Sequence, residues 1–312
     1  MSKTALFFPG QASQYVGMGK DLYDASAEVR RLYQLASDEI GEDIAKLSFE
    51  GPAETLKRTR FTQPAILLHS LAVLTMLKDA ELSFDYAAGH SLGEYGALAV
   101  CGAMSFDDAI RAVVRRASLM EEACVANPGT MAAVMGLSDE QISTVCAEAA
   151  GDGVVVPANY NSDVQIVISG SVDAVTRAAD KAKEAGAKRA MLLEVGGAFH
   201  SPLMEPARDG LQDYLQELTI NEPSRPVVAN VTATEVLDSD GIRRLLVEQV
   251  TSPVRWAQTM SFLRKNGVTR IIEIGPGKVL TGLAKRDMRP EQSVNLDTLE
   301  DVQAFAGAGV RE

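Results

Sequence analysis

The sequence predicts an α/β protein with a mainly parallel sheet and a smaller unit inserted into the larger one. Two observations favour this fold. Apolar, strand-like segments alternate with helix-like segments along most of the 312 residues, which is typical of a parallel sheet covered by helices on both faces. Between positions 127 and 196 the predicted order becomes strand, helix, strand, strand, helix, strand, which indicates a separate small unit.

The large unit is predicted to comprise residues 1–126 and 197–312. Pro64 lies near the expected start of its first long helix, where a missing N–H is harmless. After about Asp297 the sequence predicts no definite element, and a loose helix is the alternative. Strands are expected at 4–8, 86–88, 227–230 and 270–274, and helices at 63–78, 94–103, 106–123, 203–218 and 240–250.

The small unit is predicted to span residues 127–196, beginning at the turn Asn127-Pro128-Gly129. Its βαββαβ order is the ferredoxin-like arrangement. Strands are expected at 131–135, 154–158, 165–169 and 189–195, and helices at 138–149 and 172–184.

The composition argues against several classes of protein. A net charge of −12 does not suit a nucleic-acid-binding surface, which needs a basic stripe. No apolar run reaches the roughly 18 residues of a membrane helix, and the N-terminus lacks the features of a secretory signal. Cys101, Cys124 and Cys146 suggest neither a disulfide framework nor a metal site. We therefore expect a cytoplasmic protein without a metal.

The segment Gly89-His90-Ser91-Leu92-Gly93 is the strongest candidate for a catalytic motif. It fits Gly-x-Ser-x-Gly, a weak signal alone, but an apolar strand precedes it and a small-residue helix follows, as a nucleophile elbow requires. Glycines let the two backbones approach, and the helix N-terminus directs N–H groups at a developing oxyanion. We predict that Ser91 is a nucleophile. The alternative is a glycine-rich turn with an incidental serine.

A serine nucleophile needs a base, and the sequence holds three histidines. His69 lies in a strongly apolar helix and is expected in the core. His90 adjoins Ser91, and neighbouring side chains at a sharp turn are expected to project apart. His200 ends a loop after a strand, where α/β scaffolds present catalytic groups, so it is the predicted base. No acid stands out as its partner; an uncharged acceptor such as a backbone carbonyl is the alternative.

The helix expected at 106–123 carries three arginines. At about 100° per residue, Arg111 and Arg115 point away from its apolar face, whereas Arg116 lies at the edge of that face. Arg116 is therefore the one that can reach a partly buried site. A guanidinium there would bind a carboxylate in a two-pronged way. An intramolecular salt bridge is an equally simple explanation.

These motifs together resemble the bacterial malonyl-coenzyme A:acyl carrier protein transacylases and the related acyltransferase domains of fatty acid and polyketide synthases. The resemblance covers nearly the whole chain, and several blocks in one order are more specific than any single motif. The blocks are FFPGQASQYVGMG at 7–19, GPAETL at 51–56, TQPAIL at 62–67, GHSLGEY at 89–95, GAFHSPLM at 197–204 and EIGPGKVLTGL at 273–283.

The resemblance implies an α/β-hydrolase-like large subdomain with an inserted ferredoxin-like small subdomain. It also implies that Ser91 takes the malonyl group and that His200 is the base. Gln249 matches the residue whose backbone carbonyl orients the histidine, which would explain why no acid was found.

Further roles follow from the same likeness. Gln11 and the backbone N–H of Leu92 match the oxyanion hole of the family, and Arg116 matches the arginine that binds the malonyl carboxylate. Ala12 departs from the pattern, because many members have glycine there. A single methyl group is not expected to abolish the oxyanion hole.

The function implied is transfer of malonyl from malonyl-CoA to the phosphopantetheine thiol of acyl carrier protein, for fatty acid biosynthesis and without a cofactor. The alternatives are a polyketide pathway, a serine esterase or thioesterase, and a non-catalytic docking module. We expect a monomer, although no sequence feature determines the oligomeric state. An acidic carrier needs a local basic patch, and the candidates are Lys188, Arg189, Lys285, Arg286 and Arg289.

Overall fold

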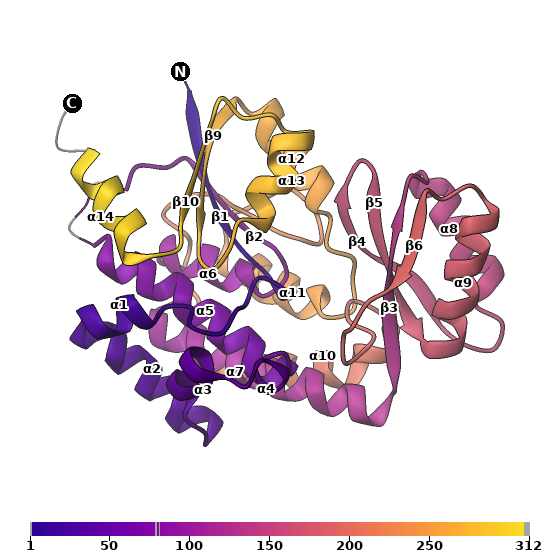
Figure 1. Ribbon diagram of the computed structural model, residues 1–312, viewed down its shortest axis with the longest axis horizontal. Helices are drawn as coiled ribbons and strands as arrows, with labels where there is room; N and C mark the ends of the chain where they lie inside the picture. Colours follow the sequence, from indigo (N-terminus) through magenta and orange to yellow (C-terminus); the bar gives the residue numbers. More distant parts are fainter. Residues whose placement is uncertain (1, 79, 81, 309–312) are drawn as a thin grey trace.

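The computed structural model describes residues 2–78, 80 and 82–308 and contains two sheets (Figure 1). A six-stranded sheet lies inside the large subdomain, and a four-stranded sheet with two helices forms the small subdomain at the right of Figure 1. This arrangement agrees with the predicted fold class.

The large sheet has the strand order β10-β9-β1-β2-β7-β8. Every neighbouring pair is parallel except β7 and β8, which are antiparallel. The carboxyl ends of the parallel strands therefore share one edge, where catalytic groups are expected. The strands are β1 (Lys3–Phe8), β2 (Tyr86–Gly89), β7 (Val227–Val228), β8 (Glu235–Val236), β9 (Val268–Ile274) and β10 (Gln292–Leu296).

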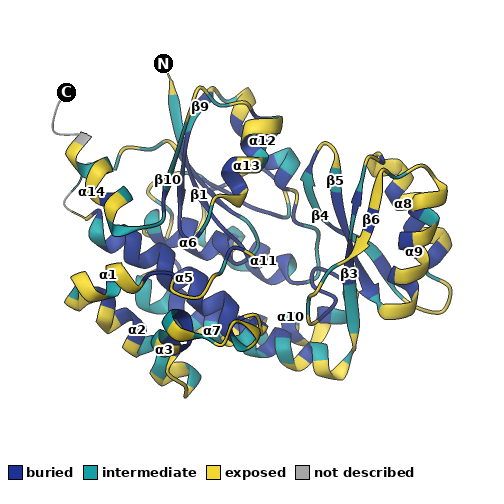
Figure 2. Ribbon diagram, viewed as in Figure 1, coloured by how far each residue is buried: buried dark blue, intermediate teal, exposed yellow. Residues whose placement is uncertain are grey.

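Alternating residues of β1 serve the two faces of this sheet, as the two-residue period of a strand requires. Leu6 and Phe8 belong to the large core shared with the long helices α5 (Thr59–Met76) and α7 (Phe106–Ala126). Ala5 and Phe7 face the opposite layer, where the Phe7 and Trp256 rings lie 5.0 Å apart between centroids. The inner strands β1, β2, β7 and β9 are accordingly mostly buried, whereas the outer helices show exposed outer faces (Figure 2).

Helices cover both faces of the large sheet. In the described part of the chain, none of them combines the length and the apolar character needed to span a bilayer. The helices are α1 (Lys20–Ala25), α2 (Ala27–Ile40), α3 (Ile44–Glu50), α4 (Ala53–Leu56), α5 (Thr59–Met76), α6 (Gly93–Val100), α7 (Phe106–Ala126), the 3₁₀ turn η1 (Pro202–Met204), α10 (Glu205–Glu217), α11 (Ser239–Gln249), α12 (Trp256–Lys265), α13 (Val279–Asp287) and α14 (Leu299–Ala308).

The start of α5 corrects one prediction. The helix begins at Thr59, so Pro64 lies inside it and not near its first turn. The residue before a proline disfavours helical angles, which is why the sequence signal favoured a start at position 63. Burial of Phe61 and Thr62 in the core stabilises the extra turn. The elements α1–α4, β8, α12 and β10 were not predicted from the sequence, although α2 has 14 residues and a buried face.

The small subdomain has the strand order β4-β5-β3-β6, with antiparallel neighbours throughout, as a ferredoxin-like unit requires. Its two helices pack on this sheet around a core of their own. β6 ends at Leu192, so the expected strand over 189–195 is too long. The exact boundaries at 127 and 196 stay predictions. The elements are β3 (Gly129–Met135), α8 (Asp139–Ala149), β4 (Val155–Ser162), β5 (Gln165–Ser171), α9 (Val172–Glu184) and β6 (Arg189–Leu192).

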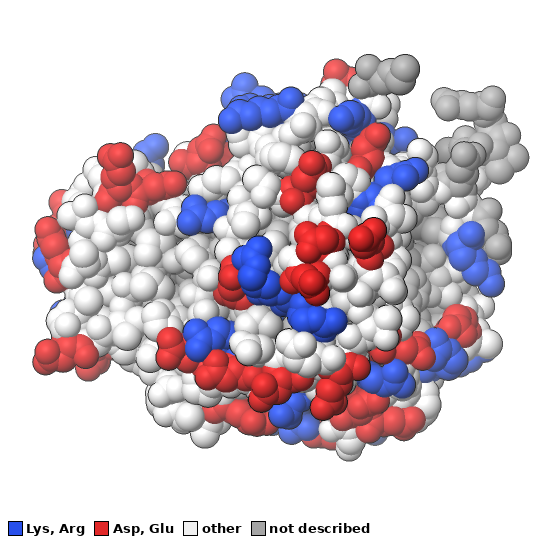
Figure 3. Space-filling view, turned by 180° about the vertical axis from the view of Figure 1, so that it is seen from behind, with Lys and Arg blue, Asp and Glu red and all other residues white. Residues whose placement is uncertain are grey.

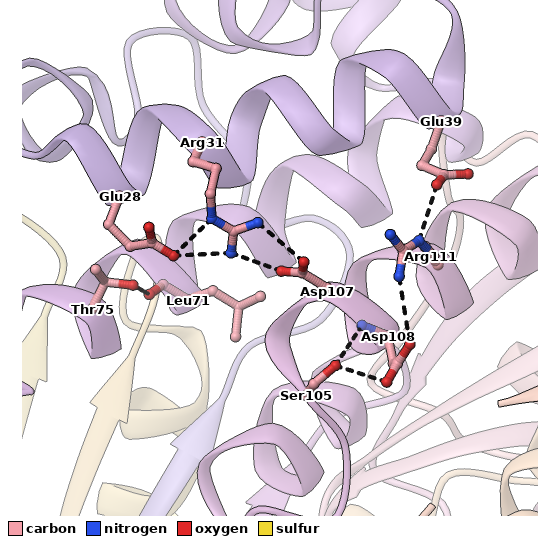
Figure 4. A network of polar contacts seen from close by, with 9 residues as sticks. All are labelled: Glu28, Arg31, Glu39, Leu71, Thr75, Ser105, Asp107, Asp108 and Arg111. Carbon is pink, nitrogen blue, oxygen red and sulfur yellow. Dashed lines mark hydrogen bonds and ion pairs between the residues drawn. The ribbon is translucent and has the colours of Figure 1, made fainter. Parts of the chain in front are cut away.

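Helix α7 is fixed at its amino end by polar contacts with α2 (Figure 4). Ser105 caps α7, because its hydroxyl accepts the N–H of Asp108 at 3.0 Å. Arg31 of α2 forms a two-pronged pair with Asp107, at 2.7 and 3.0 Å. Such exposed pairs contribute little individually, and the buried face of α7 packs in the large core.

Candidate active site

Ser91 lies on the sharp turn between β2 and α6, at the carboxyl edge of the large sheet. Its φ of 52° is left-handed, a strained conformation for a residue with a side chain. The flanking glycines are required by space: a Cβ on Gly89 would lie 2.0 Å from the carbonyl carbon of Gly93. A Cβ on Gly93 would lie 2.1 Å from the carbonyl oxygen of Phe8. The motif therefore forms the strand–turn–helix elbow predicted for it.

His200 is the histidine that the fold brings to Ser91. Its Nε2 lies 2.9 Å from Ser91 Oγ, and its Nδ1 lies 2.8 Å from the backbone carbonyl oxygen of Gln249. Because a carbonyl oxygen can only accept a hydrogen bond, Nδ1 carries the ring proton and donates this hydrogen bond. In the neutral ring Nε2 then carries a free lone pair, which faces the serine hydroxyl. This is the geometry of a general base.

The charge state of His200 follows from its surroundings. Burial and, after it, the nearby positive charge of Arg116 together lower the pKa of His200 to about 3, against the opposing hydrogen bond to Gln249. The imidazole is therefore neutral at pH 7 and ready to accept a proton.

Arg116 is the one arginine of α7 that enters the site. It is buried, its Nη2 donates to Ser91 Oγ at 3.0 Å and to Gln249 Oε1 at 2.9 Å, and its Nη1 donates to Gln63 Oε1 at 2.6 Å. Its Nε has no partner among the described residues. Arg115 is exposed, and Arg111 pairs with acids outside the site. The salt-bridge alternative for Arg116 is not what the structure shows.

Gln249, at the carboxyl end of α11, contacts the site through its backbone and through its side chain. Its backbone carbonyl accepts from His200, and its side-chain oxygen accepts from Arg116. Its side-chain nitrogen donates to the carbonyl of Ser91 at 3.0 Å and to Glu94 at 2.8 Å. Burial raises the pKa of Glu94 to about 7, although hydrogen bonds from Gln249 and the Asn230 backbone and the charge of Arg116 oppose this.

A cleft between the two subdomains leads to Ser91. Gln11, in the loop after β1, lines it together with Ser91 and His200. Leu92 is buried and precedes the first residue of α6, so its N–H lies at a helix N-terminus. Apolar side chains form much of the remaining wall, including Met131, Val167, Leu193, Leu280 and Leu283.

His90 and Ser91 line the same cleft, but their side chains have different partners. The His90 ring packs against Trp256, and its Nε2 lies 2.9 Å from Oδ1 of Asn161 on β4. His69 lies in the core as expected, with Nε2 2.7 Å from the carbonyl oxygen of Asp297.

Four polar residues that contact the site were not singled out from the sequence. They are Gln63, Glu94, Asn161 and Asn230. Gln63 and Glu94 lie in the matching blocks TQPAIL and GHSLGEY, and a polar residue within an apolar run is the signal that could have identified them. Asn161 lies in an ordinary strand, where nothing local marks it.

Comparisons with known proteins agree with this geometry. The sequence model of the acyl transferase domain family matches residues 6–301 of this chain. Over 304 residues the chain is 43% identical to a malonyl CoA-acyl carrier protein transacylase of Bacillus subtilis, which covers 97% of this chain and 96% of that protein.

Solved structures give the same result. The malonyl CoA-acyl carrier protein transacylase from Coxiella burnetii superposes with a TM-score of 0.93 at 37% identity, covering 98% of this chain and 97% of that one. A malonyl-transacylase solved in complex with its type II PKS acyl-carrier protein gives a TM-score of 0.92 at 40% identity, covering 98% and 100%. With matches of this length on both sides, the chain belongs to the acyl transferase family, as a relative of the malonyl CoA-acyl carrier protein transacylases, and is an acyltransferase.

Proposed function

We propose that this enzyme transfers a malonyl group from malonyl-CoA to the phosphopantetheine thiol of acyl carrier protein through an ester on Ser91. One observation carries the proposal: a base and a buried cation converge on a single oxygen. Ser91 Oγ lies 2.9 Å from His200 Nε2 and 3.0 Å from Arg116 Nη2. A serine hydrolase would need the base, but it has little use for a buried guanidinium beside the nucleophile.

In the first half-reaction Ser91 Oγ attacks the thioester carbonyl carbon while His200 Nε2 takes the hydroxyl proton. Collapse of the tetrahedral adduct breaks the carbon–sulfur bond, and coenzyme A leaves as the thiol with that proton. In the second half-reaction the carrier thiol gives its proton to His200 and attacks the ester carbonyl. The Ser91–acyl bond breaks, and the proton returns to Oγ.

Two further roles complete the mechanism. The N–H groups at Gln11 and Leu92 hold the negative oxygen of each adduct, supported by their place in the cleft and at the helix N-terminus. Arg116 binds the free carboxylate of the malonyl group in a two-pronged way and so positions the reacting carbonyl. Its Nε has no partner among the described residues, and its other partners are uncharged, so its positive charge is available to the carboxylate.

The carrier protein is proposed as the partner because a relative has been solved with one. Four of the five basic residues considered for docking are exposed and unpaired in the described structure, whereas Arg286 pairs with Asp287. On the face in Figure 3 basic and acidic side chains are interspersed, so docking depends on a local patch. Service to fatty acid synthesis, the cytoplasmic location, the monomeric state and independence from cofactors stay predictions.

The deciding experiment is intact mass after incubation with malonyl-CoA, for the wild type and for Ser91→Ala. We expect a malonyl adduct that Ser91→Ala lacks and that carrier protein discharges faster than water does. Free malonate without a lasting adduct would favour a hydrolase, and no reaction would favour a docking module. A carrier from a polyketide pathway that discharges the adduct faster than a fatty acid carrier would reassign the pathway.

A further inference from the structure

We infer that Gln63 is a specificity-determining residue, because it holds Arg116 through an uncharged acceptor and so leaves the positive charge of Arg116 available to an acidic acyl group. The inference rests on the proposed malonyl transfer and adds to it the residue that keeps Arg116 selective. Gln63 lies inside α5, is only 2% exposed and lines the cleft. Its Oε1 accepts from Arg116 Nη1 at 2.6 Å, and its Nε2 faces Met120 Sδ at 3.5 Å.

Arg116 is held entirely by uncharged groups. Its acceptors are the amide oxygens of Gln63 and Gln249 and the hydroxyl of Ser91. Among the described residues no carboxylate forms an ion pair with it. The nearest acid in this network, Glu94, reaches it through the amide of Gln249, which accepts from Arg116 on one side and donates to Glu94 on the other.

The other titratable groups around the guanidinium do not cancel its charge. The Tyr95 ring centroid of α6 lies 6.0 Å from Arg116 Cζ, and burial raises the pKa of Tyr95, so its hydroxyl stays neutral. His200 is also neutral at pH 7, because burial and then the charge of Arg116 lower its pKa. Glu94 is therefore the one acid of the site that can compensate part of the charge.

An amide and a carboxylate at position 63 would place Arg116 equally well, since they have nearly the same shape. They differ in what they leave for the substrate. A carboxylate would form a charge-assisted pair with Arg116 and compensate its charge before any donor arrives. The amide holds Arg116 in the same position without compensating its charge. The preference for an acidic over an uncharged acyl group should therefore depend on residue 63.

The test compares Gln63→Glu with Gln63→Met, a neutral side chain of similar length that cannot accept a hydrogen bond as the amide does. The measured quantity is the ratio of single-turnover acylation rates with malonyl-CoA and acetyl-CoA, followed by intact mass. Both rates come from one preparation, so the ratio does not depend on the folded fraction. For Gln63→Glu we expect the malonyl-to-acetyl ratio to fall by roughly 10- to 100-fold. It should recover as the pH is lowered and the introduced carboxyl group takes up a proton.

For Gln63→Met we expect both rates to fall while the ratio stays near that of the wild type, because Arg116 keeps its uncompensated charge. An unchanged ratio in Gln63→Glu, or an equal loss of the ratio in both variants, would overturn the inference. If Gln63→Glu yields no folded protein, the ratio in Gln63→Met decides: a retained ratio supports the inference, and a lost one overturns it. The proposed function fails separately, since a hydrolase would release free malonate in the wild type whatever the donor ratio.

Discussion

The backbone carbonyl of Gln249 accepts a hydrogen bond from Nδ1 of His200 at 2.8 Å, in the place where many serine enzymes have an acid. A carbonyl fixes the tautomer and the orientation of the ring as an acid would. It carries no full charge, however, and stabilises the imidazolium less. Burial and then the charge of Arg116 lower the pKa of His200, and the hydrogen bond to this carbonyl offsets only part of that lowering.

The first prediction concerns the pH dependence of acylation. Because the pKa of His200 lies at about 3, the base stays unprotonated well below pH 6.5. The value of kcat/KM for acetyl-CoA should therefore change little between pH 7 and pH 5, whereas a base with the ordinary pKa of 6.5 would lose roughly thirtyfold. Stopped-flow release of coenzyme A measures it. An acid limb centred near pH 6.5 would contradict this account of His200.

Arg116→Ala provides the complementary test. It removes a positive charge that lowers the pKa of His200, so the acid limb for acetyl-CoA should move to higher pH. Malonyl transfer should suffer most, and uncharged acyl groups should benefit by comparison. Arg115→Ala, at an exposed position of the same helix, is the matched control. Equal losses for malonyl and acetyl donors would rule out a carboxylate-binding role.

A second prediction separates the role of the Gln249 backbone carbonyl from the role of its side chain. Gln249→Ala keeps the carbonyl that orients His200 but removes the side-chain contacts to Arg116 and Glu94. Losing a hydrogen bond to a charged group should lower kcat/KM for malonyl-CoA by roughly 10- to 100-fold. The acid limb should stay below pH 6.5.

The control for Gln249→Ala is Gln216→Ala, on the exposed side of α10. An acid limb that moves to pH 6.5 while the donor preference is unchanged would assign the histidine-orienting role to the side chain of Gln249 instead.

The local parts of this site could be predicted from the sequence. The elbow at Ser91 and the loop position of His200 each depend on a few consecutive residues, and helical phase selected Arg116 from three arginines. Gln249 came from the family resemblance alone, because a backbone carbonyl leaves no mark on residue type. The contact from Gln63 to Arg116 joins two helices 53 positions apart, and no local period encodes such a pairing.

The fold follows the same division. The strands β1, β2 and β9 and the two small-subdomain helices have strong patterns and were predicted within a few residues. Helices α1, α3 and α4 are short and depend on packing more than on intrinsic propensity, whereas α2, with 14 residues, was missed despite its length. The partners of His90, Trp256 and Asn161, lie far away in the sequence, so no local pattern identifies them.

The third prediction concerns stability and Glu94. Burial raises the pKa of Glu94 to about 7, above the value of 4.5 for an exposed glutamate. Between these values the folded protein keeps a proton that the unfolded chain has lost, so the contribution of Glu94 to stability falls as pH rises through this window. Glu94→Gln removes this dependence. Relative to the wild type, the variant should gain up to about 3 kcal/mol of unfolding free energy between pH 5 and pH 8.

Urea denaturation at both pH values measures this difference. Glu222→Gln, at an exposed position, should stay within about 0.5 kcal/mol of the wild type at each pH. If the unfolding free energy of Glu94→Gln instead fell relative to the wild type as pH rises, Glu94 would ionise more easily in the folded protein. The charge of Arg116 would then outweigh burial.

The fourth prediction tests carrier docking. Lys188 and Arg189 are exposed beside β6, and Lys285 is exposed on α13, two elements that contribute to or adjoin the walls of the cleft. If an acidic carrier docks there, reversing these charges to Glu should raise KM for the carrier and leave acylation by malonyl-CoA unchanged. Lys46→Glu, on α3, is the control. An unchanged carrier KM in all three variants would dismiss this patch.

The last prediction concerns Ala12, in the loop after β1. Its φ is 80°, in the left-handed region that disfavours any side chain with a Cβ, and its N–H donates to Oε1 of Gln14 at 2.9 Å. The left-handed conformation costs an alanine about 1–2 kcal/mol, of which the greater freedom of an unfolded glycine offsets about half. Ala12→Gly should therefore raise the unfolding free energy by about 0.5–1 kcal/mol.

Ala233→Gly is the matched control, because Ala233 also has a positive φ, 54°, but lies outside the cleft lining. Both variants should gain similar stability by urea denaturation. Ala12 adjoins Gln11, so a change in kcat confined to Ala12→Gly would show that the strained turn sets the position of the oxyanion donor. Equal kcat in both variants and the wild type would mean that the methyl group of Ala12 affects stability alone. A loss of stability in Ala12→Gly would show that surrounding contacts favour the alanine despite its φ.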